Sequence, residues 1–131
     1  MPFLEIVSRA QVELIDITAA VRNTVRASGV RDGLAFLFVP HTTAAVTINE
    51  NADPDVVTDL VMELGKIVPS DDDYRHAEGN SAAHLKATLV GCSETLIVVD
   101  GDLVLGTWQG IYFCEFDGPR RRSLHLKILP G

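Results

Sequence analysis

The stretch TLIVVDGDLVL, residues 95–105, decides the fold class. Short runs of β-branched and other apolar residues flank Asp100-Gly101-Asp102, and such runs around an Asp-Gly turn are typical of a β-hairpin. A second pair of strand-like runs, residues 110–116 and 123–129, flanks a turn at Asp117-Gly118-Pro119. Repeated short strands with tight turns predict antiparallel sheet.

The rest of the chain adds strands and helices in irregular order. Four further runs have strand character: residues 3–8, 11–15, 33–39 and 44–48. Three segments carry helix signals: residues 16–28, 53–65 and 80–90. In the second helix, Asp53 suits the N-cap and Pro54 the first helical position, and an apolar stripe from Val56 to Leu64 is expected to be buried. Because helices and strands do not alternate regularly, we predict an α+β fold, an antiparallel β-sandwich with two or three helices packed on it, in one domain spanning residues 1–131.

The composition argues against several classes of protein. The 131 residues are 47% hydrophobic and 22% charged, which is unlike a disordered chain. No apolar run approaches the roughly 20 residues of a membrane span, and the N-terminal MPFLEIVSR has no cationic leader, so we expect a soluble cytoplasmic protein without a membrane partner. The two cysteines, Cys92 and Cys114, form no CxxC motif and are expected to be small core residues.

The net charge of −7 is confined to one segment. Residues 49–78 contain nine acidic residues against only Lys66 and Arg75, so the remainder of the chain is neutral. Nucleic-acid binding depends on a cationic surface, which this chain lacks, and we expect no nucleic-acid partner. The acidic segment is either a solvated face or the lining of a cation site.

Three histidines in loop-like surroundings near the acidic segment are candidate metal ligands: His41, His76 and His84. Neutral imidazole is a common ligand of transition metals, and three histidines with one open position form a recurring catalytic site. Their spacing matches no local motif, so they form a site only if the fold brings them together; otherwise they are surface or structural histidines. His125 alternates with Leu124 and Leu126 and is expected to face outward from a strand.

Several polar residues could bind a phosphorylated ligand. Asn49, Glu50 and Asn51 lie between a strand and a helix, where they could fix a ligand or merely satisfy the turn. The helix that begins near Asn80 has a free N-terminus with Lys86 farther along it, so a phosphate could bind there. Arg120 belongs to a run of three arginines that could contact phosphate or guard a sheet edge.

Two further residues stand in apolar surroundings. Trp108, between two glycines, could stack on a planar ligand or fill the core. Glu115 lies within an apolar strand, where it is either buried and paired or exposed at a sheet edge. The chain contains no GxSxG, P-loop, GxGxxG or HExxH motif, so the familiar hydrolase, nucleotide and zincin mechanisms lack local support.

Three long motifs make essentially the whole chain similar to the YjbQ-like family. They are HTTAAVTINENADP (residues 41–54), HAEGNSAAHLK (76–86) and LGTWQ (105–109), and Glu115 accompanies them. The resemblance implies a homotrimer with its polar motif residues near the subunit boundaries. It also implies a secondary thiamine-phosphate synthase activity, which joins a pyrimidine diphosphate to a thiazole phosphate and releases pyrophosphate.

The candidate site residues follow from these motifs together with side-chain chemistry. The motif histidines His41, His76 and His84 would hold a divalent metal, for which imidazole ligands favour zinc or manganese over magnesium. The candidate catalytic residues are Glu50, Glu78, Trp108, Gln109 and Glu115, and the candidate ligand-binding residues are Asn49, Asn51, Lys86 and Arg120. We expect a metal-dependent enzyme acting on a small phosphorylated metabolite. The alternatives are a non-catalytic trimer that binds a metal or metabolite, and a metal-assisted hydrolase of a small phosphorylated compound.

Overall fold

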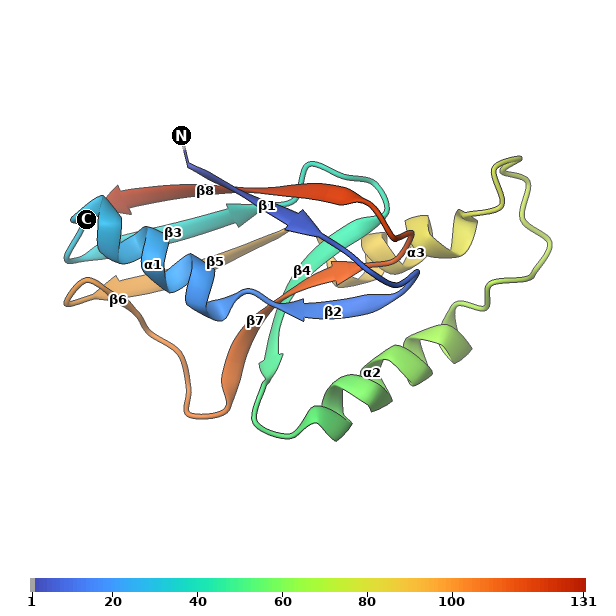
Figure 1. Cartoon of the computed structure of the whole chain (residues 1–131), viewed down its shortest axis with the longest axis horizontal. Coiled ribbons are helices and arrows are strands. Elements are labelled where there is room, and N and C mark those ends of the chain that lie inside the picture. The colour runs from blue at the N-terminus through green and yellow to red at the C-terminus, as the bar shows by residue number, and fades with distance from the viewer. Residues whose placement is uncertain (1) are drawn as a thin grey trace.

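Two antiparallel sheets form the body of the protein (Figure 1). The computed structural model describes residues 2–131. The strands are β1 (Phe3–Val7), β2 (Glu13–Asp16), β3 (Gly33–Phe38), β4 (Ala44–Glu50), β5 (Ser93–Val99), β6 (Asp102–Leu103), β7 (Gln109–Glu115) and β8 (Arg121–Pro130); the helices are α1 (Thr18–Ser28), α2 (Pro54–Ile67) and α3 (Ser81–Val90). One sheet has the strand order β1-β8-β3-β5-β6 and the other β2-β7-β4. The predicted α+β fold, with antiparallel sheets and helices packed on them, is confirmed.

The hairpin predicted from residues 95–105 joins β5 to β6. Val99 pairs with Asp102, so Asp100 and Gly101 form a two-residue loop. Both loop residues have a positive φ, 53° and 76°, as a type I′ turn requires. This geometry explains why an Asp-Gly pair occupies the turn.

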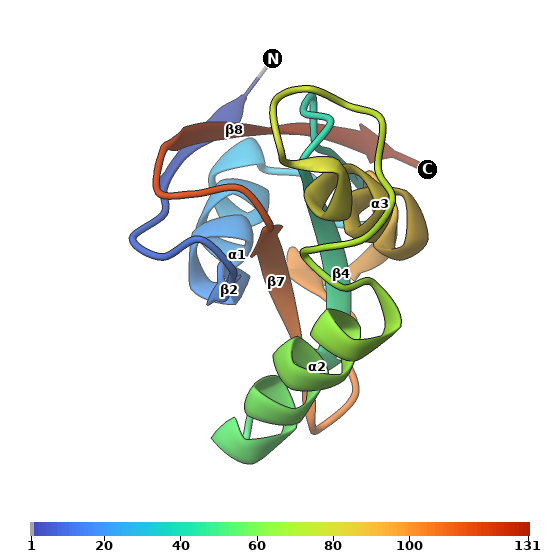
Figure 2. The same cartoon turned by 90° about the vertical axis from the view of Figure 1, so that its right-hand side faces the viewer.

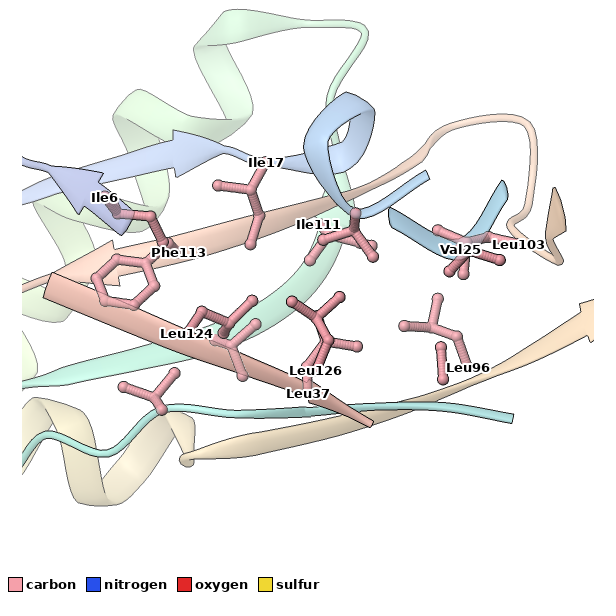
Figure 3. Close-up of a cluster of buried hydrophobic side chains, with 14 of the residues drawn as sticks. Ile6, Ile17, Val25, Leu37, Leu96, Leu103, Ile111, Phe113, Leu124 and Leu126 are labelled. Atoms are coloured by element: carbon pink, nitrogen blue, oxygen red, sulfur yellow. The ribbon is translucent and has the colours of Figure 1, made fainter. Parts of the chain in front are cut away.

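The main core lies between the two sheets (Figure 3). Alternation along the strands selects its members, because successive side chains of a strand point to opposite faces. In β3, Ala35 and Leu37 are buried, whereas Leu34, Phe36 and Phe38 face outward. The core also takes side chains from β1, β5, β7, β8 and α1: Ile6, Leu96, Ile111, Phe113, Leu124, Leu126, Val21 and Val25.

The outer face of the five-stranded sheet, named here the outer sheet face, carries exposed apolar side chains that no other part of residues 2–131 covers. Ile97, Leu34 and Leu129 form one cross-strand row on it, and their side chains are 57%, 44% and 45% exposed. Phe38 lies on the same face opposite His125. His125 therefore faces outward, as predicted, between the inward-facing leucines of β8.

A second, smaller apolar cluster attaches α3 to the three-stranded sheet. Ala83 and Ala87 of α3 pack against Ala45 of β4 and Cys114 of β7, and these small side chains let the helix lie close to the strands. Cys114 is buried, as predicted, but the prediction for Cys92 was wrong: its side chain is exposed at the start of β5. Cys92 follows the end of α3, where the chain leaves the cluster.

The prediction that the apolar stripe of α2 is buried was wrong. No residue of α2 is fully buried, and Met62 and Ile67 are 50% and 62% exposed. The helix lies at one end of the molecule (Figure 2), and the stripe residues Val56, Leu60 and Leu64 are half-buried. Within residues 2–131, no helix has the length and apolar character that crossing a bilayer requires.

Candidate functional site

A hollow of about 460 Å³ lies where the connection between β3 and β4 meets α3. His41 and Thr42 line it from the connection, and His84 and Thr88 line it from the helix. The hollow is not filled by side chains because other residues that line it are small: Ala44, Ala87 and Gly91. Packing of α3 on β4 therefore brings together two of the three candidate histidines, although they are far apart in the sequence.

The third candidate, His76, lies next to His84. Their ring centroids are 5.3 Å apart and the rings are almost perpendicular, at 86°. Two imidazoles bound to one tetrahedral zinc, with Zn–N bonds of about 2.1 Å, have ring centres about 5 Å apart. The His76–His84 pair thus has a separation that fits a shared metal ion.

A complete three-ligand group is not formed by the single chain. Among residues 2–131, no three His, Cys, Asp or Glu side chains come together as a metal-binding group. Glu78 lies near the pair, with its Oε2 3.9 Å from Nε2 of His76. The chain therefore supplies two imidazoles with a carboxylate nearby, and metal binding at this pair stays a prediction.

The hydrogen bonding of His41 explains its separate position. Its Nε2 accepts a hydrogen bond from the backbone N–H of Ser123 at 2.9 Å. Burial lowers the pKa of His41, and the positive charge of Arg122 lowers it further, so the ring is neutral at pH 7 and its proton resides on Nδ1. With one nitrogen accepting and the other protonated, His41 is a hydrogen-bond donor in this arrangement and presents no free lone pair to a metal.

Glu115 is buried and paired, one of the two environments expected for it. The side chains of Glu115 and Arg122 are 0% and 3% exposed, and Nε of Arg122 donates to Oε1 of Glu115 at 3.0 Å. Burial raises the pKa of Glu115, but the hydrogen bonds from Arg122, Ser8 and the Asp117 N–H outweigh this and lower it. Glu115 is ionised and enclosed, so in this chain it positions Arg122 rather than facing a ligand.

The sequence analysis treated Arg122 only as part of the run of three arginines and missed its burial and its pairing with Glu115. Its second terminal nitrogen donates to Oγ1 of Thr43 at 2.7 Å, which fixes the connection that carries His41. The alternation of β8 could have indicated this burial, because Arg122 lies on the same face of the strand as the buried Leu124 and Leu126.

A second group of predicted residues lies at the opposite end of β4. Glu50 pairs with Gln109 across β4 and β7, and the Asn51 N–H donates to the carbonyl of Trp108 at 2.9 Å. Trp108 is 62% exposed and does not fill the core. Six residue steps at about 3.3 Å separate Ala44 from Glu50, so this end lies roughly 20 Å from the histidine hollow along the strand.

Polar bonds define the conformation of that second end. Oε1 of Gln109 accepts from the Gly106 N–H at 2.8 Å and closes the loop that carries Trp108. Oδ1 of Asn49 accepts from the backbone N–H of Glu50 at 2.7 Å, and Nδ2 of Asn51 donates to Asp16 at 3.2 Å. Glu50 and Trp108 remain the side chains at this end without such a structural bond in the described chain.

The two predicted phosphate-binding cations differ in their surroundings. Arg120 donates to the carboxylate of Asp117 at 3.0 Å and to its carbonyl at 2.9 Å. Lys86 is 5% exposed and lies over the ring of Phe116, with Nζ 5.9 Å from the ring centre. In the described chain, Arg120 therefore forms an ion pair with Asp117, whereas Lys86 has no acidic partner.

Fold and site together define a small α+β protein with a histidine-lined hollow at one end of β4 and an exposed Trp108 loop at the other. The chain belongs to the UPF0047 protein YjbQ-like family, whose profile matches residues 3–131. It is 51% identical over 125 residues to a UPF0047 protein of Methanocaldococcus jannaschii, covering 95% of this chain and 91% of that protein. It is 49% identical over 127 residues to the UPF0047 protein YugU of Bacillus subtilis, covering 96% of each.

Solved structures of the family have the same fold. The crystal structure of an uncharacterised YjbQ/UPF0047 protein of Clostridium acetobutylicum superposes with a TM-score of 0.96 at 52% identity, over 98% of this chain and 100% of that one. A protein of unknown function from Sulfolobus solfataricus superposes with a TM-score of 0.95 at 34% identity, over 99% of this chain and 96% of that one. The family assignment expected from the three motifs is confirmed.

Proposed function

We propose that the protein is a metal-dependent enzyme that acts on a small phosphorylated molecule, as a homotrimer. The observation that carries the proposal is the pair His76 and His84, whose ring centres are 5.3 Å apart at the edge of the hollow that His41 also lines. Glu78 places a carboxylate 3.9 Å from Nε2 of His76, and the same loop carries Asp71, Asp72 and Asp73. This negative charge favours a bound cation.

Zinc or manganese suits this donor set better than magnesium, because magnesium prefers oxygen ligands. His76 and His84 would hold the ion, which when bound supplies a positive charge that stabilises a leaving phosphate or diphosphate. The protonated Nδ1 of His41 is a hydrogen-bond donor, and Glu78 is an acceptor that can orient a hydroxyl or a water molecule. The reaction that fits these demands is a transfer with release of pyrophosphate, as in a secondary thiamine-phosphate synthase.

Two features support a homotrimer. The outer sheet face and the stripe of α2 leave apolar side chains exposed in a single chain, and exposed apolar patches of this kind mark interaction surfaces. The motif residues also form two groups about 20 Å apart along β4. Association of copies would cover the apolar surfaces, and it would allow Glu50 and Trp108 of one subunit to approach the histidines of a neighbour.

The test measures metal content and turnover on the same samples. Protein purified without chelator or histidine tag is analysed for bound metals, and pyrophosphate release is followed with a pyrimidine diphosphate and a thiazole phosphate. We expect bound zinc or manganese, lost in His76→Ala and His84→Ala and retained in His125→Ala, whose imidazole lies on the outer sheet face. Absence of metal from the wild-type protein would contradict the proposal, and metal with no turnover would favour a non-catalytic binding protein.

A metal-assisted hydrolase of a small phosphorylated compound would use the same donor set. The products distinguish the two reactions, because the hydrolase releases inorganic phosphate from a single substrate and needs no second one. Sedimentation of the wild-type protein tests the trimer, which a monomeric mass at micromolar concentration would contradict.

A further inference from the structure

A small pocket on the other side of α3 contains the buried lysine. It has a volume of about 50 Å³ and lies between the first turns of α3, the segment after β1 and the end of β7. Its lining includes Lys86, Asn80, Gly79, Gln11, Phe116 and Asp117. About 10–15 Å³ holds one water molecule, so the pocket has room for about three to five water-sized atoms.

The charge of Lys86 has no partner in this chain. Within residues 2–131, its Nζ makes no hydrogen bond and no ion pair; the residue as a whole is 95% buried, but Nζ itself is not fully enclosed. Desolvation by burial is the only cause that lowers the pKa of Lys86, which means that no neighbouring carboxylate offsets the cost of burying its charge. A buried cation without an anion is costly, and such groups are normally paired.

The first turn of α3 leaves further donors free, one of them on Ala82, which lines the same pocket. Asn80 is the N-cap residue, but its side chain makes no cap hydrogen bond; its Nδ2 donates instead to Asp117 at 2.9 Å. In the described chain, the N–H groups of Ser81 and Ala82 have no acceptor. Free N–H groups and the helix dipole at a helix N-terminus both favour a bound anion.

The pocket also contains acceptors, which restrict the kind of anion. Oδ1 of Asn80 is buried and has no hydrogen-bond partner. The carboxylate of Asp117 lines the pocket too, but its charge is offset by Arg120 at 3.0 Å. An occupant must therefore accept from Lys86 and donate to Asn80. A phosphate group that retains one P–O–H does both, whereas a carboxylate or a sulfate at neutral pH can only accept.

The pocket is separate from the histidine site. Residues of an α-helix advance by about 100° each, so His84 and Lys86 point to opposite sides of α3. His84 lines the hollow with Ala87 and Thr88, whereas Lys86 lines the pocket with Ala82 and Ala83. An anion beside Lys86 therefore requires no metal at the histidines.

From these contacts we infer that the pocket is a phosphate-binding site, in which the buried Lys86 and the free N–H groups of α3 hold the phosphate group of a small molecule or inorganic phosphate itself. The inference does not depend on the proposed enzyme activity. The expected ligand is a phosphate with one protonated oxygen, and its binding depends on Lys86.

The test is thermal unfolding of the full chain in increasing inorganic phosphate, at constant ionic strength and pH. The melting temperature of the wild-type protein is expected to rise and to saturate, because a ligand that binds only the folded state stabilises it. Lys86→Met, which keeps the length of the side chain and removes the charge, is expected to weaken phosphate binding by about tenfold or more. Lys66→Met, an exposed lysine of α2, is the matched control and keeps the full response.

Each outcome has a defined meaning. No saturable stabilisation of the wild type, or an unchanged response in Lys86→Met, overturns the assignment. Equal stabilisation by sulfate and phosphate overturns the assignment to a protonated phosphate. If Lys86→Met does not fold, Lys86→Gln provides the same comparison with a polar side chain. His84→Ala retains the phosphate response and Lys86→Met retains bound metal, so failure of this site and failure of the histidine site are distinguishable.

Discussion

Replacing Arg122 by Met tests whether the buried ion pair stabilises the fold. Arg122→Met removes the cation from a Glu115 side chain that is 0% exposed and leaves that carboxylate without its main partner. Breaking one side of a buried pair costs about 3–5 kcal/mol, because the remaining charge is desolvated. A domain of this size is stable by roughly 5–15 kcal/mol, so the loss is a large share of the total.

The pH dependence of the contribution of Glu115 to stability should change sign in Arg122→Met. In the wild type the pKa of Glu115 is lowered below 4.5, so its contribution is fully present above that pH and is lost as pH falls through the lowered pKa. In Arg122→Met, burial dominates and raises the pKa of Glu115, so protonation at lower pH relieves the penalty. The difference in stability between variant and wild type should therefore be larger at pH 7 than at pH 5.

Urea denaturation followed by circular dichroism, at one fixed protein concentration, measures both effects. Arg121→Met is the matched control, because the Arg121 side chain is 82% exposed and its pair with Glu5 at 3.4 Å lies on the surface. It should change stability by less than about 1 kcal/mol. The double variant Arg122→Met/Glu115→Met should lose less than Arg122→Met alone. A loss below about 1 kcal/mol for Arg122→Met at pH 7, or a difference that grows on acidification, would refute the reasoning.

Three further predictions concern separate parts of the molecule. Gly33→Ala places a Cβ in collision with the backbone oxygen of Leu129 and should destabilise the protein by about 2 kcal/mol or more. Gly65→Ala in α2 meets no atom within 4 Å and should stabilise it by about 0.5–1 kcal/mol. Urea denaturation compares the two variants, and equal effects would contradict the prediction. Asp53→Ala removes the side chain that accepts from the Asp55 N–H at the start of α2 and should lower the free energy of unfolding by about 1 kcal/mol. The control Asp59→Ala should lower it by less. An unchanged midpoint of urea denaturation for Asp53→Ala would count against the N-cap. Burial raises the pKa of Cys114 to about 12, so a thiol reagent at pH 8 should modify one thiol per native chain and two per denatured chain. The variant Cys92→Ser should abolish the reaction of the native protein. Rapid modification of both thiols in the native protein would instead show that Cys114 is accessible.

Much of the fold could be predicted because its signals are local. The Asp-Gly turn between β5 and β6 requires positive φ at both positions, and the Asp53-Pro54 start of α2 follows from the chemistry of two adjacent residues. The burial of α2 could not be predicted in the same way. Periodicity shows that a helix has an apolar face, but it does not show whether the partner of that face belongs to the same chain.

The candidate site was less predictable because its members are joined by tertiary packing. His41 and His84 line one hollow only because α3 packs on β4, and no spacing in the sequence encodes that contact. The sequence left Trp108 undecided between core and surface, since flanking glycines permit either. The alternation of its strand left two possible environments for Glu115, buried and paired or exposed at an edge. The choice between them depended on Arg122, which belongs to a different strand.

The position of α2 has an electrostatic consequence. Residues 49–78, which include α2 and most of the loop after it, carry the whole net charge of the chain, and α2 projects from one end of the molecule (Figure 2). The molecule is therefore strongly polarised, and its field attracts dications within a Debye length of about 8 Å at physiological salt. Because His76 belongs to that loop, the field would raise the local concentration of cations beside the imidazole pair.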